Sequence, residues 1–340
     1  MTDAAEESGL FAAVDCGTNS VRLLVARLRG GRLEEVDRRL HITRLGQGVD
    51  ATGEFHPDAL ARTFAAFDDF AAELDGLGRA AVRVVATSAA RDARNSADFF
   101  AGARRAFGVD AEIIPGAQEA ALSFEGALAG LPGVPSPVLV MDVGGGSTEL
   151  ALGGSAGPAL GLPTDASSGV DAVAAAGSSQ LPPGARPGLG RAVSLDIGSV
   201  RLRERFLASD PPTASEIESA ERLADELLDG AGVDFEVATW VGVGGTATAL
   251  AAIALGLERY DRSRVHGAVL SRSDLGALAE RLLSMPVAEV AAIPTMVPGR
   301  ADVICAGALI CRAVGRRVGV PLTVSESDIL DGIVRRLAGM

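Results

Sequence analysis

The chain has 340 residues, of which 48% are hydrophobic, and carries a formal net charge of −13. The length favours two domains, and no run reaches the roughly 20 apolar residues of a membrane span. The acidic balance disfavours nucleic acid as a partner, and the absence of lysine excludes a P-loop and Schiff-base chemistry.

The three cysteines, Cys16, Cys305 and Cys311, show no zinc-binding spacing. Their odd number argues against a disulfide framework. Residues 1–9 are small and acidic, without the basic and apolar segments of a signal peptide. The composition therefore predicts a cytoplasmic protein with no membrane association. All its basic side chains apart from histidine are arginines, which suit bidentate contacts to phosphate.

The first part of the chain shows several strands and then alternating strands and helices, which is typical of an α/β domain. Apolar β-branched runs predict the strands, and apolar residues at helical spacing predict the helices. The expected strands are residues 10–16, 21–28, 33–43, 81–86 and 111–114. The expected helices are residues 57–74, 96–107 and 118–129, with Ser96 as the N-cap of the second.

After a proline-rich linker at residues 131–135, the pattern starts again. The segment 153–190 is rich in Gly, Ser, Pro and Ala, and we expect it to be a flexible insertion. The expected strands are residues 138–143, 148–152, 192–197, 237–243, 266–270 and 322–324. The expected helices are residues 198–202, 213–228 with Ser215 as N-cap, 247–255, 273–283, 287–292, 300–318 and 328–338. These elements predict one domain at 1–130 and another at 131–340, with helix 328–338 packing back on the first.

The pattern Asp-x-Gly-x-x-Ser occurs at residues 15–20 and again at residues 142–147, each time after a short apolar run. Glycine lets backbone amides approach a ligand closely, and successive amides form an anion-binding concavity. In the second copy Glu149 adds a carboxylate, and carboxylates suit Mg²⁺. The repeat indicates two phosphate-binding turns, although a tight hairpin with solvated acids would show the same pattern.

A third glycine turn, residues 242–246, also follows a predicted strand. Its Gly245 and Thr246 open a helix, whose first amides suit an anion. Arg22, Arg91 and Arg300 lie near these turns or open helices, and each is either a phosphate contact or a surface side chain. Phosphoryl transfer needs mainly positioning and charge stabilisation. We therefore expect the three turns to meet one phosphate chain in a cleft between the domains.

Glu119 is the best candidate for a general base. It lies in the first turn of a predicted helix, where the helix dipole favours the ionised form that a base needs. The alternative is that Glu119 only stabilises its helix N-terminus. The histidines, His41, His56 and His266, are scattered, and we expect them to be structural or on the surface.

At these residues the chain resembles the exopolyphosphatase and guanosine pentaphosphate phosphohydrolase (Ppx/GppA) family. The combination of Asp-Val-Gly-Gly-Gly-Ser-Thr-Glu at 142–149 with Thr-Ser-Ala-Ala-Arg at 87–91 is highly specific. The matching segments cover nearly the whole chain and are residues 14–23, 86–95, 115–120, 142–149, 198–202, 244–246 and 298–302.

The resemblance implies an α/β fold of two actin-like, ribonuclease H-like domains of the sugar kinase, heat-shock ATPase and actin superfamily, with the site in the interdomain cleft. It implies hydrolysis of the terminal phosphate of polyphosphate, or of guanosine pentaphosphate, with Mg²⁺ or alternatively Mn²⁺. The catalytic glutamate falls on Glu119, the phosphate-contacting arginine on Arg91, and the metal-associated acids on Asp142 and Glu149. The phosphate-binding glycines and polar residues fall on Gly17, Thr18, Asn19, Ser20, Gly144, Gly145, Gly146, Ser147 and Thr148.

One departure concerns the base, because the family usually has two consecutive acids where this chain has Gln118 and Glu119. Catalysis is retained if the second acid of the pair, Glu119, is the general base, and it is in doubt if the first acid is. Long relatives also carry C-terminal helical domains, so this chain resembles a short form.

Two further hypotheses stay open. A small-molecule kinase of the same superfamily would use residues 242–246 to hold adenosine. A non-catalytic sensor would bind polyphosphate or a guanosine tetra- or pentaphosphate without hydrolysing it. We expect a homodimer, as the commonest oligomer.

Overall fold

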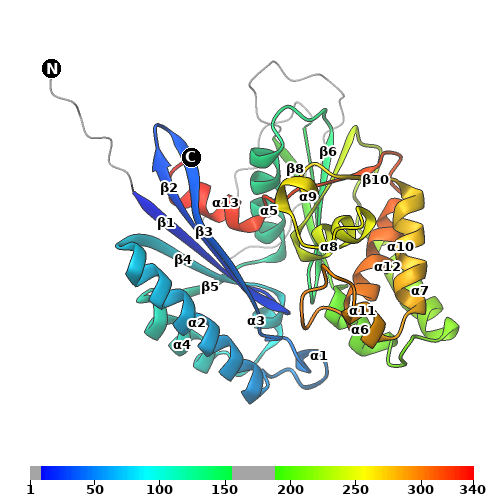
Figure 1. Cartoon of the computed structure of the whole chain (residues 1–340), viewed down its shortest axis with the longest axis horizontal. Helices are drawn as coiled ribbons and strands as arrows, with labels where there is room; N and C mark the ends of the chain where they lie inside the picture. The colour runs from blue at the N-terminus through cyan, green and yellow to red at the C-terminus, as the bar shows by residue number, and fades with distance from the viewer. Residues whose placement is uncertain (1–8, 155–187) are drawn as a thin grey trace. The chain divides into compact units, whose positions relative to one another are not determined.

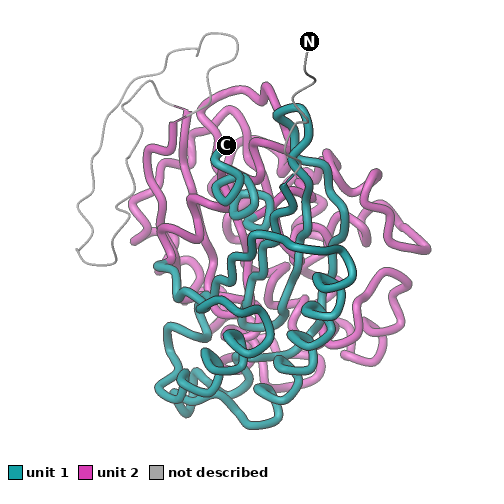
Figure 2. The backbone as a smooth tube through the Cα atoms, turned by 90° about the vertical axis from the view of Figure 1, so that its left-hand side faces the viewer, with its two compact units in different colours: residues 1–115, 329–340 teal, residues 116–328 magenta. Residues whose placement is uncertain are grey.

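The computed structural model describes residues 9–154 and 188–340. The chain forms two compact units, one of Met1–Pro115 with Ile329–Met340 and the other of Gly116–Asp328. Figure 1 labels the elements, and Figure 2 colours the two units separately. Most of the expected insertion at 153–190 lies outside the described residues.

Unit 1 contains a five-stranded sheet in the order β3-β2-β1-β4-β5. Strands β1, β2 and β3 form an antiparallel meander, and β4 and β5 continue the sheet in parallel with β1. The strands are β1 (Leu10–Cys16), β2 (Ser20–Arg29), β3 (Arg32–Ile42), β4 (Ala80–Ala86) and β5 (Ala111–Ile113). The helices are α1 (Val49–Thr52), α2 (Pro57–Leu77), α3 (Ser88–Asp92), α4 (Ala97–Phe107) and α13 (Ile329–Leu337).

The core of unit 1 lies between its sheet and helices α2 and α4. Helix α2 begins at a proline, which is preorganised for the first helical position. Its Phe67 stacks at 5.8 Å between ring centroids against Phe99 of α4. On the strands, Val14 and Leu23 are fully buried in the same cluster. The last helix of the chain, α13, lies against β1 and β2 (Figure 1).

Unit 2 contains a six-stranded sheet in the order β10-β11-β9-β6-β7-β8. The strands are β6 (Val138–Val143), β7 (Thr148–Gly153), β8 (Leu189–Leu195), β9 (Thr239–Val243), β10 (Val269–Leu270) and β11 (Leu322–Val324). The helices are α5 (Gly116–Gly130), α6 (Ser199–Phe206), α7 (Ala214–Gly230), α8 (Gly244–Ala254), α9 (Arg262–Val265), α10 (Arg272–Ser284), α11 (Val287–Ala291) and α12 (Ile304–Gly315).

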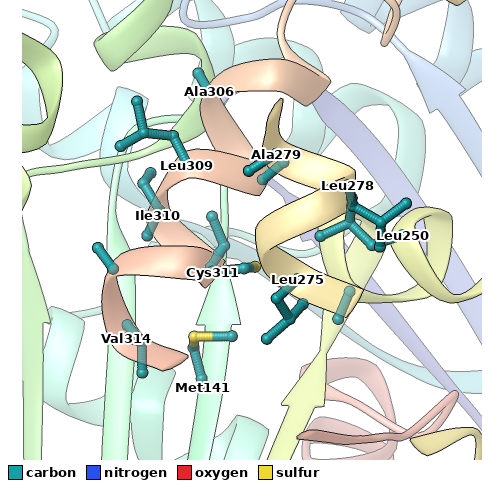
Figure 3. Packing of buried hydrophobic residues seen from close by; sticks show 14 of the residues in the cluster. Met141, Leu250, Leu275, Leu278, Ala279, Ala306, Leu309, Ile310, Cys311 and Val314 are labelled. Atoms are coloured by element: carbon teal, nitrogen blue, oxygen red, sulfur yellow. The ribbon is translucent and has the colours of Figure 1, made fainter. Parts of the chain in front are cut away.

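Helices α10 and α12 form the main core of unit 2 with the sheet. Figure 3 shows Leu275 and Leu278 of α10 in one cluster with Ile310 and Cys311 of α12, and with Met141 of β6. Burial raises the pKa of the Cys311 thiol to about 12, so it acts as an apolar side chain and not as a nucleophile.

The two sheets share one topology. The series β3-β2-β1-β4-β5 in unit 1 corresponds to β8-β7-β6-β9-β11 in unit 2, with the same alternation of antiparallel and parallel neighbours. The sequence repeat at 15–20 and 142–147 therefore reflects two copies of one fold. Each copy begins with a hairpin that carries the glycine turn.

Several expected boundaries differ in the structure. We expected the first domain to extend to residue 130, but helix α5 (Gly116–Gly130) groups with unit 2, since it packs on β6, β7 and β8. Helix α13 groups with unit 1. The expected long helix at 300–318 is shorter, since α12 spans Ile304–Gly315; residues 300–303 form a turn in which the Val303 amide donates to the Arg300 carbonyl at 3.1 Å.

The helix caps also differ from expectation. Thr213, and not Ser215, caps α7, because its hydroxyl accepts from the Glu216 amide in a capping box. Ser96 precedes α4 but makes no capping hydrogen bond with its side chain. Among the described residues, none of the helices has the length and hydropathy of a bilayer-crossing segment.

Candidate active site

The glycine turn of unit 2 connects β6 to β7. Its backbone closes through a hydrogen bond from the Gly144 amide to the Ser147 carbonyl, at 3.0 Å. Strand register places Asp142 directly opposite Glu149 on the two strands. Both acids are buried, with 8% and 1% of their surface exposed. The hairpin therefore presents a glycine turn flanked by two carboxylates, as the sequence predicts.

The glycine turn of unit 1 has the same geometry. The Gly17 amide donates to the Ser20 carbonyl at 3.0 Å, and register places Asp15 opposite Arg22. A Cβ atom on Gly17 would lie 3.2 Å from the Ser20 carbonyl oxygen, which is tight for any other residue. The corresponding distance at Gly144 is also 3.2 Å. The predicted repeat is thus confirmed at the level of backbone geometry.

The residue opposite the acid distinguishes the two copies. In unit 1, Arg22 donates to Oδ2 of Asp15 from Nε and Nη2, at 3.1 and 2.6 Å. In unit 2, the equivalent position holds Glu149 opposite Asp142. One hairpin therefore neutralises its acid internally, whereas the other carries two buried carboxylates.

Helix α5 adds a third carboxylate to this site. Burial raises the pKa of Glu149 well above its ordinary value, and the nearby charges of Glu119 and Asp142 raise it further. Hydroxyls of Ser194 and Ser147 oppose this rise. Glu119 is 9% exposed, so all three acids are buried, and Glu119 and Asp142 are both within electrostatic reach of Glu149.

These acids fit a hard divalent cation. Oε1 of Glu149 accepts from the Ser194 hydroxyl at 2.7 Å, while the buried Oε2 has no hydrogen bond of ordinary geometry with a described residue. The described part of the chain holds no set of three or more His, Cys, Asp or Glu side chains arranged as a metal site. Mg²⁺ is usually held by one or two carboxylates with substrate phosphates, and the pair Asp142 and Glu149 has the chemistry of such a site.

The third glycine turn lies beside Asp142. Strand β9 pairs in parallel with β6, and Gly244, which follows β9, has φ of 75°. Arg300 packs on the same turn, donating from Nη1 to the Gly245 carbonyl at 3.1 Å. The Thr246 hydroxyl donates to the Val143 carbonyl at 2.8 Å and so ties this turn to the end of β6.

Three of the predicted substrate-binding residues also have hydrogen-bond partners within the protein. The Thr148 hydroxyl is fully buried and donates to the Ile197 carbonyl at 2.6 Å. The Thr246 hydroxyl and the Arg22 guanidinium are engaged as described above. The partners of these three groups lie far away in sequence or across the hairpin. The motif alone therefore does not reveal these hydrogen bonds.

The turn at 144–146 also caps a helix. The amides of Ser199 and Val200 at the start of α6 donate to the carbonyls of Gly144 and Gly145, at 2.9 and 2.8 Å. A Cβ atom on Gly198 would lie 2.4 Å from the Gly145 carbonyl, so only glycine permits this approach. The carbonyls of Gly144 and Gly145 therefore accept hydrogen bonds from the first amides of α6.

Arg91 lies in the short helix α3 of unit 1. Its Nη1 donates to the Ile114 carbonyl at 3.0 Å, which fixes the guanidinium near the end of β5. Thr18 of the first glycine turn is held by another loop, since its carbonyl accepts from the Gly46 amide at 2.8 Å.

Sequence reasoning missed three residues around these turns, Ser123, Ser194 and Arg44. Ser123 donates to Oδ2 of Asp142 at 3.2 Å, and its spacing of one helical turn from Glu119 was the available signal. Gly116 and Ser194 meet between α5 and β8. Arg44 has φ of 52°, and its amide donates to the Asn19 carbonyl at 2.9 Å.

A model of the Ppx/GppA phosphatase family matches residues 24–319. The chain belongs to this family. It is 44% identical to Exopolyphosphatase 2 of Mycobacterium tuberculosis, over 96% of this chain and 98% of that protein. The resemblance inferred from the motifs is thereby confirmed.

Solved structures place the Ppx/GppA chain in the expected fold class, α/β with two actin-like units. A crystal structure of an exopolyphosphatase-like protein matches with a TM-score of 0.82 and 39% identity, covering 96% of this chain and 99% of that one. The Ppx/GppA enzyme of Aquifex aeolicus matches with a TM-score of 0.73 and 28% identity, covering 97% of this chain and 99% of that one.

Proposed function

We propose that the protein is an exopolyphosphatase, which hydrolyses the terminal phosphoanhydride bond of inorganic polyphosphate and releases orthophosphate. The observation that carries the proposal is the buried group of Glu119, Asp142 and Glu149 beside a glycine turn. The name of the relative at 44% identity over nearly the full length supports the same activity.

Glu119 acts as the general base. It orients a water molecule and removes a proton from it as the water oxygen attacks the terminal phosphorus in line. The bond from that phosphorus to the bridging oxygen breaks, and the shortened chain leaves with its negative charge. The first turn of α5 favours the ionised form of Glu119 that this step needs. General-base assistance contributes about 10²- to 10⁴-fold in rate.

Asp142 and Glu149 would hold Mg²⁺, or alternatively Mn²⁺. When bound, the cation neutralises charge on the substrate's phosphate oxygens. The carboxylates themselves, buried opposite each other, are otherwise mutually repulsive. The proposal therefore predicts that the free protein binds a divalent cation before substrate.

Phosphate oxygens are bound by main-chain amides and arginines. Unit 2 contributes Gly144, Gly145, Gly146, Ser147, Gly245 and Arg300. Within unit 1, the residues proposed to bind phosphate are Gly17, Thr18, Asn19, Ser20 and Arg91. Thr148, Thr246 and Arg22 belong to the same proposal, and their hydrogen bonds within the protein also hold the turns in place.

Incubation of the pure protein with Mg²⁺ and polyphosphate of defined length, with measurement of orthophosphate, tests the activity directly. Glu119→Gln keeps the shape of the side chain and removes the base, so we expect turnover to fall at least a hundredfold. Glu218→Gln, on an exposed face of α7, is the matched control and stays within twofold of wild type. Near-normal turnover of Glu119→Gln would refute the assignment of the base.

Hydrolysis of guanosine pentaphosphate is the second candidate, and one observation favours it. The Tyr260 hydroxyl donates to Glu326 and lies close to Thr248 and Arg300 beside the third glycine turn. The ring is 43% exposed. Polyphosphate has no base to stack on an aromatic ring, whereas a guanosine does.

Tyr260→Ala separates the two substrates. If a guanosine stacks there, the variant loses at least tenfold in kcat/KM for guanosine pentaphosphate and stays within twofold for polyphosphate. Tyr260→Phe keeps the ring and should retain most of the nucleotide activity. Equal losses for both substrates would exclude base recognition at Tyr260.

The same assays decide the remaining hypotheses. Phosphorylation of an acceptor by ATP, without hydrolysis, would select a kinase, and tight binding without phosphate release would select a sensor. Gln118→Glu restores the usual pair of acids, and a rise of tenfold or more in turnover would show that Gln118 limits catalysis. We also propose that the protein is a homodimer and that it is cytoplasmic. Its three cysteines are free and buried, which is compatible with a reducing compartment.

A further inference from the structure

Two serines outside the predicted motifs contact the two acids of the β6–β7 hairpin. The hydroxyl of Ser123 on α5 donates to Oδ2 of Asp142 at 3.2 Å, and the hydroxyl of Ser194 on β8 donates to Oε1 of Glu149 at 2.7 Å. Strand register places Ser194 directly opposite Glu149. Each acid is therefore held through one oxygen by a neighbouring element.

Ser194 also contacts the start of the helix that carries Glu119. A Cβ atom on Gly116 would lie 2.2 Å from Cβ and 2.6 Å from Oγ of Ser194. The first turn of α5 can approach β8 this closely only because residue 116 has no side chain. Ser194 thus contacts both the first turn of α5, which carries Glu119, and the carboxylate of Glu149.

This contact has an electrostatic consequence. Close approach of α5 to β8 brings Glu119 near Glu149, and their charges repel, as the raised pKa of Glu149 reflects. A buried like-charge pair needs both a fixed separation and hydrogen bonds to the charged forms. The Ser194 hydroxyl supplies such a bond to Glu149, and its Cβ limits how far α5 can move toward β8.

We propose that Ser194 is a positioning residue, whose hydroxyl holds Oε1 of Glu149 so that Oε2 receives the divalent cation, and whose Cβ sets the approach of α5. The inference rests on the proposed function. It adds a residue from the edge strand β8, which belongs to none of the family's matching segments named above.

Ser194→Ala tests the hydroxyl while keeping Cβ. We expect the affinity of the substrate-free protein for Mn²⁺, measured by electron paramagnetic resonance, to fall about tenfold. With saturating metal, kcat falls at least fivefold while KM for polyphosphate stays within twofold. Thr239→Val is the matched control, since it removes another buried hydroxyl of the same sheet, which donates to the Pro135 carbonyl at 2.7 Å. It should lose comparable thermal stability and bind Mn²⁺ normally.

The packing role is tested by a double-mutant cycle. Gly116→Ala alone forces α5 away from Ser194 and should lower both kcat and the melting temperature. Ser194→Gly removes the colliding atoms, so Gly116→Ala should cost clearly less in that background. Equal costs in the two backgrounds would overturn the packing role.

The outcomes separate this inference from the proposed function. Wild-type Mn²⁺ affinity in Ser194→Ala would refute the positioning role, even if the wild-type protein hydrolyses polyphosphate. Conversely, absence of hydrolysis by the wild-type protein would refute the function, while loss of Mn²⁺ affinity in Ser194→Ala would still support the role of Ser194 at the cation site.

Discussion

Gly244 faces the carboxylate of Asp142 so closely that a Cβ atom on it would lie 2.4 Å from Oδ1. The same glycine has φ of 75°, a conformation that costs other residues about 1 kcal/mol or more. The start of α8 therefore forms part of the wall around the acids of the β6–β7 hairpin. Glycine is required here for both space and backbone conformation.

We expect Gly244→Ala to lower kcat at least tenfold and to lower the melting temperature, because the added methyl group displaces Asp142. Gly276→Ala is the control. Gly276 lies within α10, and a Cβ atom there would meet no heavy atom within 4 Å. That variant should gain roughly 0.5–1 kcal/mol of stability from helix propensity and keep full activity. Normal activity of Gly244→Ala would contradict the role given to this turn.

The second prediction concerns removal of the metal. Glu149 is buried beside Glu119 and Asp142, so its charge destabilises the metal-free protein. Glu149→Gln removes that charge with little change in shape. We therefore expect its melting temperature in EDTA to exceed that of wild type. Addition of Mg²⁺ should stabilise wild type and leave the variant unchanged, since only a bound ligand shifts the unfolding equilibrium. Calorimetry with and without Mg²⁺ measures both effects, and equal stabilisation by Mg²⁺ would exclude Glu149 as a ligand.

Arg44 gives a third prediction. It has a left-handed backbone conformation at φ of 52°, held by the Asn19 carbonyl of the first glycine turn. Backbone strain is common at functional sites, and Arg44 lies beside a glycine turn, so we predict that it binds phosphate. We expect Arg44→Ala and Arg44→Gly both to raise KM for polyphosphate at least fivefold. The glycine variant should be more stable than the alanine variant by about 1 kcal/mol, since glycine adopts this conformation without strain. An unchanged KM in both would mean that the strain serves only the turn.

The capping box of α7 predicts a pH dependence. Hydrogen bonds from the Thr213 backbone, with others from Ser209, lower the pKa of Glu216 from 4.5 to about 2. A depressed carboxyl pKa stabilises the fold above the unfolded-state value, and this contribution disappears as pH falls from 4.5 toward 2. Glu216→Gln should therefore be less stable than wild type at pH 7. The difference should shrink as the pH is lowered through that range.

Urea unfolding of both proteins at several pH values measures the difference. Glu218→Gln, which changes an exposed acid of the same helix, should match wild type throughout. A constant difference between Glu216→Gln and wild type at all pH values would show that the charge of Glu216 does not contribute.

Local sequence patterns were sufficient to predict those strands and turns whose structure depends mainly on their own residues. Strands β1 and β11 have the predicted boundaries, because short apolar runs ended by turn residues need little further context. The repeat of Asp15 and Asp142 was visible because each acid and its glycine turn lie within one hairpin. The pairing of Asp142 with Glu149 follows from the same hairpin register.

The features that sequence reasoning missed depend on contacts between distant segments. Ser194 meets Gly116 only when β8 and α5 pack together, and no spacing reveals this. Thr148 looks like a phosphate ligand in the motif, yet its hydroxyl is taken by the Ile197 carbonyl. Ser215 has a good capping side chain, but the helix begins at Ala214, two residues before the start that a Ser215 cap would give, so that Thr213 is the cap.

Unit 1 consists of two separate stretches of the chain, because α13 at the far end covers β1 and β2. During synthesis on the ribosome, the N-terminal sheet must therefore wait for more than 200 intervening residues, Gly116–Asp328, before its covering helix emerges. Unit 2 is continuous and can complete its core first. Nascent chains stalled before residue 329 should consequently expose the sheet face that α13 later covers, and should engage chaperones more strongly than the released protein.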